Sequence, residues 1–202
     1  MHSIYFFKEA KFNELIIYKK DYNLEVFMSF LIRKATIEDI DLIVELWRKL
    51  SVDQMSKDPY YKGSMEFAGG QKQFSDALNN PNCCIFLAEV DDVVSGFVEV
   101  WLYNRDFHFF VDDYAYILHF FVEEASRKNK EMVGIVYKLY KAAEKWALSK
   151  GKKYLVADVF EHNQRVVKLL EFVGLKVYRM RLVKNIENEA GDKDEIIHEE
   201  NN

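Results

Sequence analysis

The run Arg127-Lys128-Asn129-Lys130 places three cations between an apolar strand that ends at Val122 and the helix that follows. A helix N-terminus has unpaired backbone N–H groups and a partial positive charge, so cations at this point favour an anion such as phosphate. His119 lies in the strand, and an imidazole changes charge near neutral pH. These residues predict an anion site next to a group that can accept a proton. Structural roles without chemistry stay open as alternatives. The cations could simply be solvated at the start of the helix, and His119 could be a buried, hydrogen-bonded residue of the strand.

Other residue types that could do chemistry are less well placed. Asp112, Asp113 and Glu123 stand at strand ends and could act as bases through water, whereas His108 and His162 fall in predicted loops. No Ser-His-Asp set, metal-binding triad or phosphate loop of the Walker type is recognisable. Cys83 and Cys84 are adjacent, which is too strained for an ordinary disulfide. We therefore expect a reducing, cytoplasmic location and no metal site.

The elements around these residues follow from apolar spacing. After Gly134, apolar residues recur every three or four positions and predict an amphipathic helix that ends at Gly151. Its stripe comprises Val136, Leu139, Tyr140, Ala143, Trp146 and Ala147. Tyr154 to Phe160 has the length and composition of a buried strand. Asn163 then opens a second helix, which Gly174 closes.

The first half of the chain adds strands and two helices. Leu31 to Lys34 predicts a strand, and Thr36 with Asp39 forms a capping-box pattern for the next helix. Phe67 to Leu78 predicts another helix, weakened by two glycines. Two strands joined by Asp91-Asp92 predict a hairpin. We expect further strands at Tyr114 to Val122 and Leu175 to Val183.

This order of elements, from Leu31 to Lys184, resembles the GNAT superfamily of acetyl-CoA-dependent N-acetyltransferases. The resemblance implies an α/β (α+β) fold with a mixed, mostly antiparallel central sheet and helices on both faces. It also implies a cleft where the strand ending at Val122 splays from the strand starting at Tyr154. Backbone amides around Phe121 and Val122 would meet pantetheine there, the pyrophosphate would lie over the basic run up to Gly134, and Asn163 would contact the cofactor or cap its helix.

Two family motifs are degenerate in this chain. Counting from Val122 puts Lys130 and Met132 where the pyrophosphate loop has glycines. Counting back from Gly151 puts Gly134 at the first glycine instead, so the two registers differ by about one helical turn. In the Asn163 motif, Leu170 replaces the tyrosine that often protonates the leaving thiolate.

The resemblance implies an acyltransferase that moves acetyl from acetyl-CoA to an amine by direct attack, with His119 as the candidate base. The degenerate motifs leave a second reading open: an inactive GNAT-like binding or interaction module. The acceptor, a small-molecule or peptide amine, would meet the acidic and aromatic segments 51–64 and 103–114.

Composition limits the remaining classes. The net charge of −5 argues against nucleic acid, which requires a clustered basic face. No apolar segment is long enough for a membrane span. We expect residues 28–185 to form the GNAT-like domain, 1–27 to be an extension and the acidic segment 186–202 to be disordered. The sequence does not decide between Met1 and Met28 as the start, and it is compatible with a homodimer.

Overall fold

The computed structural model describes residues 30–61, 69–104, 113–124, 133–180 and 182. The chain divides into two compact units, residues 1–157 and 158–202, and each is described by itself. The predicted N-terminal extension and acidic tail lie outside the described residues.

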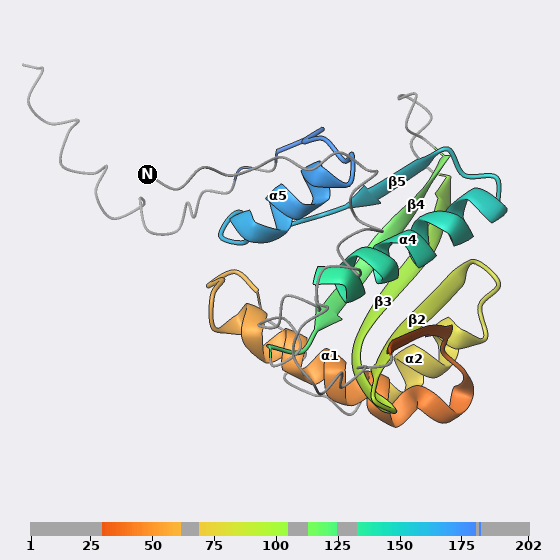
Figure 1. The fold of residues 1–202 in the computed structure, drawn as a ribbon. Helices are drawn as coiled ribbons and strands as arrows, with labels where there is room; N and C mark the ends of the chain where they lie inside the picture. Colours follow the sequence, from red (N-terminus) through yellow and green to blue (C-terminus); the bar gives the residue numbers. More distant parts are fainter. Residues whose placement is uncertain (1–29, 62–68, 105–112, 125–132, 181, 183–202) are drawn as a thin grey trace, which may run out of the picture. The chain divides into compact units, whose positions relative to one another are not determined.

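The first unit is built on a five-stranded sheet in the order β1-β2-β3-β4-β5 (Figure 1). The strands are β1 (Phe30–Lys34), β2 (Cys83–Val90), β3 (Val93–Asn104), β4 (Asp113–Val122) and β5 (Tyr154–Ala157). Neighbours from β1 to β4 are antiparallel, and β5 runs parallel to β4. The predicted hairpin is confirmed: Asp91 and Asp92 both have positive φ, 47° and 63°, as a two-residue type I′ turn requires.

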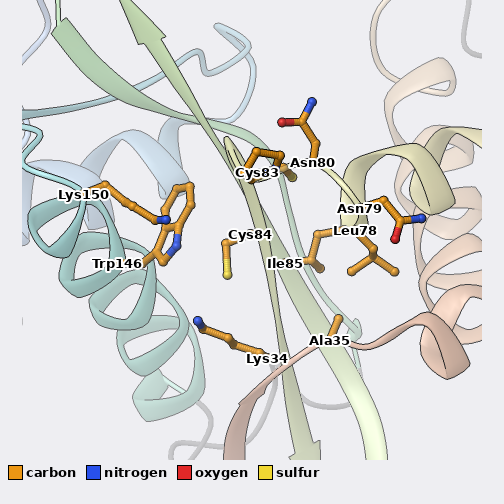
Figure 2. A pocket seen from close by; sticks show the side chains of 11 residues that line it. Lys34, Ala35, Leu78, Asn79, Asn80, Cys83, Cys84, Ile85, Trp146 and Lys150 are labelled. Carbon is orange, nitrogen blue, oxygen red and sulfur yellow. The ribbon is translucent and has the colours of Figure 1, made fainter.

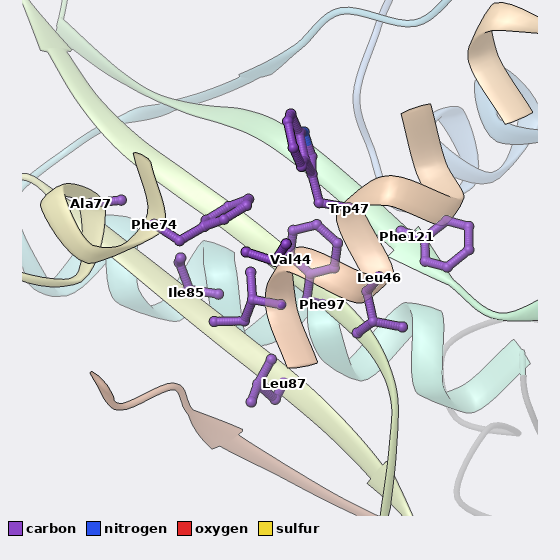
Figure 3. Packing of buried hydrophobic residues seen from close by; sticks show 10 residues of the cluster. Val44, Leu46, Trp47, Phe74, Ala77, Ile85, Leu87, Phe97 and Phe121 are labelled. Atoms are coloured by element: carbon purple, nitrogen blue, oxygen red, sulfur yellow. The ribbon is translucent and has the colours of Figure 1, made fainter. Parts of the chain in front are cut away.

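Helices cover both faces of this sheet, as predicted. On one face, α1 (Ile40–Met55) and α2 (Gly70–Leu78) pack against β2, β3 and β4. Their shared core is drawn in Figure 3 and comprises Ile43, Val44, Leu46, Trp47, Phe74, Ala77, Ile85, Leu87, Phe97 and Phe121. The predicted α2 glycines stand at its N-terminus rather than inside it. A Cβ on Gly70 would lie 3.1 Å from the Trp47 ring, so glycine permits this close approach.

The other face is covered by α4 (Val133–Ser149), which connects β4 to the parallel β5. Its buried residues are Ile135, Leu139, Tyr140, Ala143, Trp146 and Ala147. Ile135 is therefore buried where the sequence suggested Val136, which is half-buried. The predicted helix stop is confirmed, because Gly151 has φ +77° and Lys152 N–H donates to Ala147 O at 3.1 Å.

The second unit contains α5 (Gln164–Phe172), with Asn163 at its N-cap position and Gly174 at φ +100° after its end. Several of its apolar residues are half-buried: Val166, Val167, Leu169, Leu170 and Val173. The strand predicted at Leu175 to Val183 is wrong for residues 175–180 and 182, which have no regular structure. A strand requires a hydrogen-bonded neighbour, and the described residues of this unit supply none.

A β-bulge in β4 determines which side chains share a face with His119. Glu99 pairs with His119, but the next residue, Val100, pairs with Ile117, so Leu118 is the extra residue. Directly paired residues project to the same face of a sheet. His119 therefore projects toward α1 and α2 with Glu99, whereas Ile117 projects toward α4 with Val100. In a regular strand, residues two apart would share a face.

The bulge at Leu118 also marks where the pairing of β4 with β5 ends. Among the described residues, β5 pairs with β4 from Tyr114 to Ile117, and its last residue, Ala157, lies opposite Ile117. Beyond the bulge, Leu118 to Val122 continue along β3 without a recorded β5 partner. From the bulge onward, β4 therefore has no partner in β5 within the described residues, and we call this segment the open edge of β4; the expected separation of the two strands requires such an edge.

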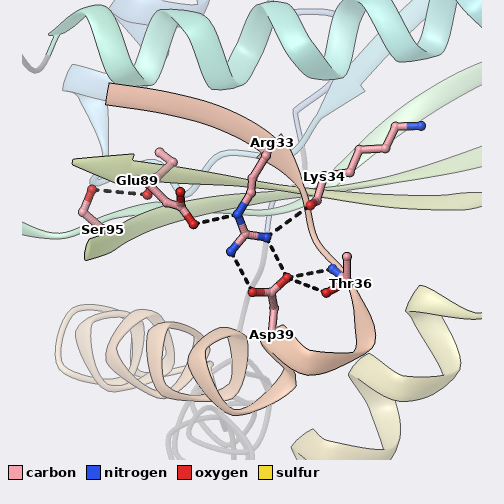
Figure 4. Close-up of polar contacts among 7 residues, drawn as sticks. Arg33, Lys34, Thr36, Asp39, Glu89 and Ser95 are labelled. Atoms are coloured by element: carbon pink, nitrogen blue, oxygen red, sulfur yellow. Dashed lines mark hydrogen bonds and ion pairs between the residues drawn. The ribbon is translucent and has the colours of Figure 1, made fainter. Parts of the chain in front are cut away.

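A separate polar network ties β1 to the start of α1 and to β2 (Figure 4). Arg33 donates two hydrogen bonds to Asp39, at 2.7 and 2.8 Å, and its Nε donates to Glu89 Oε1 at 2.6 Å. The predicted capping box is present: Thr36 N–H donates to Asp39 Oδ2 at 2.7 Å. It precedes the short 3-10 helix η2 (Ile37–Asp39), which leads into α1. Hydrogen bonding to Arg33 lowers the pKa of Asp39 to about 2.

Candidate active site

The central feature of the site is a hydrogen-bonded pair, His119 on β4 and Glu99 on β3. His119 Nδ1 lies 2.6 Å from Glu99 Oε2. The Glu99 side chain is fully buried, whereas 17% of the His119 side chain is exposed. The imidazole therefore connects a buried carboxylate to accessible space. This geometry suits proton transfer at the remaining ring nitrogen, Nε2.

Aromatic rings hold this imidazole on the α1/α2 face. The rings of Phe74 from α2 and Phe97 from β3 both lie 6.3 Å from the His119 ring, centroid to centroid. The Cys83 thiol from β2 is close enough to Glu99 for their charges to interact, and burial raises the pKa of that thiol, which keeps it neutral. The pair is therefore surrounded mainly by apolar groups, where a hydrogen bond to a carboxylate is strong.

The open edge of β4 presents backbone amides next to this pair. Glu123 N–H donates to Ser95 O at 2.8 Å, toward β3. Hydrogen-bonding direction alternates along an antiparallel ladder, so the N–H groups of Val122 and Phe120 point to the opposite edge. The amide of Phe121 points toward β3. Of the two amides expected to meet pantetheine, only that of Val122 therefore points away from β3, and the amide of Phe120 points the same way.

The other candidate bases are engaged by lysines. Glu123 accepts from Lys49 of α1 at 2.5 Å, and Asp113 forms an ion pair with Lys152. His162, in the second unit, stacks on Phe160. Asp112 and His108 lie outside the described residues.

The predicted cofactor residues are described in part. Arg127, Lys128, Asn129 and Lys130 lie outside the described residues. Gly134 is in the first turn of α4, and a Cβ there would meet no described residue within 4 Å. Asn163 occupies the N-cap of α5, but its side chain makes no capping hydrogen bond, so that amide does not perform the capping role.

Two further features lie on elements of the α1/α2 side. Tyr103 stacks on its cross-strand partner Tyr114 with ring centroids 5.7 Å apart, and Tyr116 meets Tyr103 edge-on at the same distance. All three tyrosines are half-buried.

In the last turns of α1, Ser51 Oγ and Gln54 Oε1 are buried without a hydrogen-bond partner within the described part of the chain. Such atoms favour a polar ligand or water.

A hollow of about 340 Å³ is lined by the C-terminal end of α4, by Cys83 to Ile85 of β2 and by the end of α2. Figure 2 shows the side chains of Lys34, Lys150 and Trp146 around Cys84. Burial raises the pKa of the Cys84 thiol, and the two lysines oppose that effect. Both cysteines are free, as expected, and their side chains project to opposite faces. Neither His119 nor Glu99 lines this hollow.

Glu99 is the functional candidate that the sequence analysis missed. It stands in the apolar run Phe97 to Val100 of β3, where a charged residue on the same side as Phe97 indicates a buried carboxylate. Burial of a carboxylate requires hydrogen-bond partners. That pattern alone could have pointed to Glu99, whereas its pairing with His119 depends on strand register.

Among the described residues, no group of three or more His, Cys, Asp or Glu side chains could hold a metal ion. None of the described helices combines the length and apolar character that crossing a bilayer demands.

Comparison with known proteins identifies the class. The sequence profile of the acetyltransferase (GNAT) family matches residues 45–175. The chain belongs to this family, whose members use acetyl-CoA as the acyl donor. No curated protein sequence gives a significant match.

Solved structures agree on the fold. The chain is similar to aminoglycoside N-acetyltransferase AAC(6')-Iy in complex with CoA, with a TM-score of 0.65 and 15% identity over 80% of this chain and 97% of that one. A predicted acetyltransferase from Clostridium acetobutylicum, solved with acetyl-CoA, gives a TM-score of 0.58 and 16% identity over 79% of this chain and 98% of that one. A proposed acetyltransferase from Pyrococcus furiosus gives 0.59 and 23% over 78% and 100%. These similarities establish the GNAT fold.

Proposed function

We propose that this protein is an N-acetyltransferase that moves the acetyl group of acetyl-CoA to an amine. The observation that carries the proposal is the combination, at one bulge in β4, of an open strand edge and a hydrogen-bonded imidazole. Pairing with β5 ends at Ile117, and His119 begins the segment whose outer amides are unpaired by β5. An acyl transfer site requires both parts: N–H groups for the carbonyl oxygen and a base for the attacking amine.

The reaction needs one base and one oxyanion donor. The amine nitrogen attacks the thioester carbon, and its surplus proton passes to His119 Nε2. The Val122 N–H stabilises the negative charge that develops on the carbonyl oxygen. The C–S bond then breaks and CoA leaves as a thiolate, which takes a proton from the imidazolium or from water. At pH 7 about one lysine-like amine in 10³ is neutral, so a base at this position has a substantial cost to offset.

The three tyrosines support a preference for a cationic amine with an apolar body. Aromatic faces attract ammonium groups and also cover apolar surface. Tyr103, Tyr114 and Tyr116 project from the same face as His119, because their β3 and β4 pairings place them there. This class includes amino sugars, polyamines and lysine side chains. Acetyl transfer to one member of each type, with a matched alcohol as control, would rank them.

The alternative function is a GNAT-like binding module without turnover. It is favoured by the degenerate pyrophosphate loop and by Leu170, which stands in place of the usual tyrosine acid. Loss of that acid slows the reaction without preventing it, because a thiol with a pKa of about 8.5, by analogy with cysteine, can leave partly as thiolate. Glu99 and His119 favour the enzyme, since a binding module has no need for a paired imidazole.

Acetyl-CoA binding and turnover are tested separately. Acetyl-CoA at about 100 times its Kd should raise the free energy of unfolding by about 2.7 kcal/mol, which a thermal shift would detect. Release of free CoA thiol with an amine panel would measure turnover. Binding without turnover, or no shift at millimolar acetyl-CoA, would contradict the enzyme and leave the GNAT-like binding or interaction module.

The basic run is tested by a double variant. Arg127→Ala with Lys130→Ala should weaken acetyl-CoA binding by about 1 kcal/mol or more, because charge-assisted contacts to phosphate are lost. Lys72→Ala is a matched control, since Lys72 is exposed on α2 and pairs with Asp76. Equal affinities in both variants would remove the basic run from the site.

A further inference from the structure

Glu99 is a fully buried carboxylate whose two oxygens have different partners. Oε1 accepts from the indole Nε1–H of Trp101 at 2.6 Å, and Oε2 lies 2.6 Å from His119 Nδ1. Trp101 is two residues further along β3 and therefore projects to the same face. The carboxylate is held at one end by a fixed donor and at the other by the imidazole.

The hydrogen-bond partners of the two Glu99 oxygens determine which imidazole nitrogen of His119 carries the hydrogen. The indole N–H of Trp101 can only donate, so it occupies Oε1. An ionised carboxylate can only accept, so Oε2 must receive a hydrogen from His119 Nδ1. A neutral imidazole has one N–H. With that hydrogen on Nδ1, the lone pair is on Nε2, the nitrogen that does not face Glu99.

We propose that Glu99, oriented by Trp101, is the positioning residue that fixes His119 in the Nδ1–H tautomer and leaves Nε2 free to accept the proton of the attacking amine. The inference rests on the proposed function for its catalytic meaning. The tautomer itself is a property of the free protein. Glu99 does not touch substrate; it acts through His119.

The arrangement is more specific than packing requires. An apolar residue at position 99 would fill the space between Phe97 and Trp101 without burying a carboxylate, whose burial requires hydrogen-bond partners. The bulge at Leu118 is also necessary, because without it His119 and Ile117 would share a face and the pairing with Glu99 would be lost. The nearby thiol of Cys83 does not compete for the proton, since burial raises its pKa.

A single substitution should reverse the tautomer. In Glu99→Gln, the amide oxygen is the acceptor that Trp101 requires, which turns the amide NH₂ toward His119. Nδ1 must then accept, so the hydrogen moves to Nε2 and the base is lost. The rate of acetyl transfer should fall roughly 10²-fold or more, because a wrong tautomer removes general-base catalysis.

A second substitution should restore the tautomer. In Glu99→Gln with Trp101→Phe, the indole donor is absent, so the amide can flip and accept from Nδ1–H. Activity should recover by about 10-fold or more relative to Glu99→Gln, although the double variant lacks one more hydrogen bond. Trp101→Phe alone retains the carboxylate and is the baseline for this comparison.

Nitrogen-15 NMR of the His119 ring in the absence of substrate reads the tautomer directly. We expect Nδ1–H in the wild type, Nε2–H in Glu99→Gln and Nδ1–H again in the double variant. The same tautomer in all three proteins, or Nε2–H in the wild type, would overturn the proposal. If the three proteins show the expected tautomers but the wild type transfers no acetyl group, the proposed function is refuted. The proposal that Glu99 positions His119 would still hold.

Discussion

Asp39 and Glu99 are both buried carboxylates that accept hydrogen bonds from side chains, but their partners differ in chemistry. Asp39 is bound by the guanidinium of Arg33, which also reaches Glu89. A guanidinium keeps its charge in proteins at all ordinary pH values. Glu99 is bound by an indole N–H and by an imidazole, which can gain or lose a proton.

The Arg33 network and the Glu99 network therefore use a buried carboxylate for different purposes. The Arg33 network is a permanent ion pair that joins β1, η2 and β2, and hydrogen bonding to Asp39 raises the pKa of Arg33 further. The Glu99 network ends in a group whose charge can change and whose edge reaches accessible space. A buried carboxylate alone does not indicate a catalytic site. The proton-transfer capacity of its partner separates the two cases.

The largest effect should follow from removing the imidazole. His119→Gln preserves most of the side-chain volume, and the Gln amide can still donate to Glu99 Oε2. The free energy of unfolding should therefore change little, while kcat/KM falls by about 10²- to 10⁴-fold. Acetyl-CoA affinity, measured by calorimetry, serves as the control and should be retained. A variant that keeps its activity would direct attention to Asp113 and Glu123.

The matched change in the other network should affect stability instead. Asp39→Asn replaces one carboxylate oxygen by an amide NH₂ that faces a guanidinium, so it should reduce the free energy of unfolding by roughly 2 to 3 kcal/mol at pH 7. Chemical denaturation measures this loss. Asp76→Asn is the control: its pair with Lys72 on α2 is exposed, and the change should be below about 0.5 kcal/mol. Equal losses in the two variants would contradict a special role for the Arg33 network.

The sequence predicted those features that short segments determine. Thr36 with Asp39, the Asp91-Asp92 turn and the glycines after α4 and α5 are local signals, and each is confirmed. The failures involve packing between distant segments. Ile135 is buried instead of Val136 because the rotation of α4 is set by the sheet beneath it. The strand predicted after Gly174 needed a ladder partner, which no local pattern guarantees.

The candidate site shows the same division. His119 could be selected from the sequence by its type and its place in an apolar strand. The face to which it projects could not, because one extra residue at Leu118 changes the alternation and is visible only in the pairing with β3. Glu99 lies twenty residues from His119 in the chain, so their contact follows from register. Periodicity within one strand cannot reveal it.

Acid titration tests the contribution of Asp39 to stability. Arg33 holds the pKa of Asp39 at about 2, below the value of about 3.9 for an unperturbed aspartate. A depressed carboxyl pKa contributes stability above the unfolded pKa and loses it as the pH falls toward the folded pKa. The wild type should therefore lose about 2 kcal/mol relative to Asp39→Asn between pH 5 and pH 2, by about 1.4 kcal/mol per unit. Parallel stability curves for the two proteins would refute this linkage.

The smallest effect should come from the outer member of the Arg33 network. Glu89 accepts one hydrogen bond from Arg33 Nε at 2.6 Å, and both side chains are partly exposed, 20% and 31%. Glu89→Gln keeps an oxygen that can accept this bond and removes only the charge, so solvent screening should limit the loss to below about 1 kcal/mol. Glu45→Gln, at an exposed pair with Lys49, is the control. High salt should reduce the difference between wild type and Glu89→Gln, because screening weakens partly exposed pairs. A loss as large as that of Asp39→Asn would show that Glu89 and Asp39 share the guanidinium equally, and the network would then depend on β2 as much as on the start of α1.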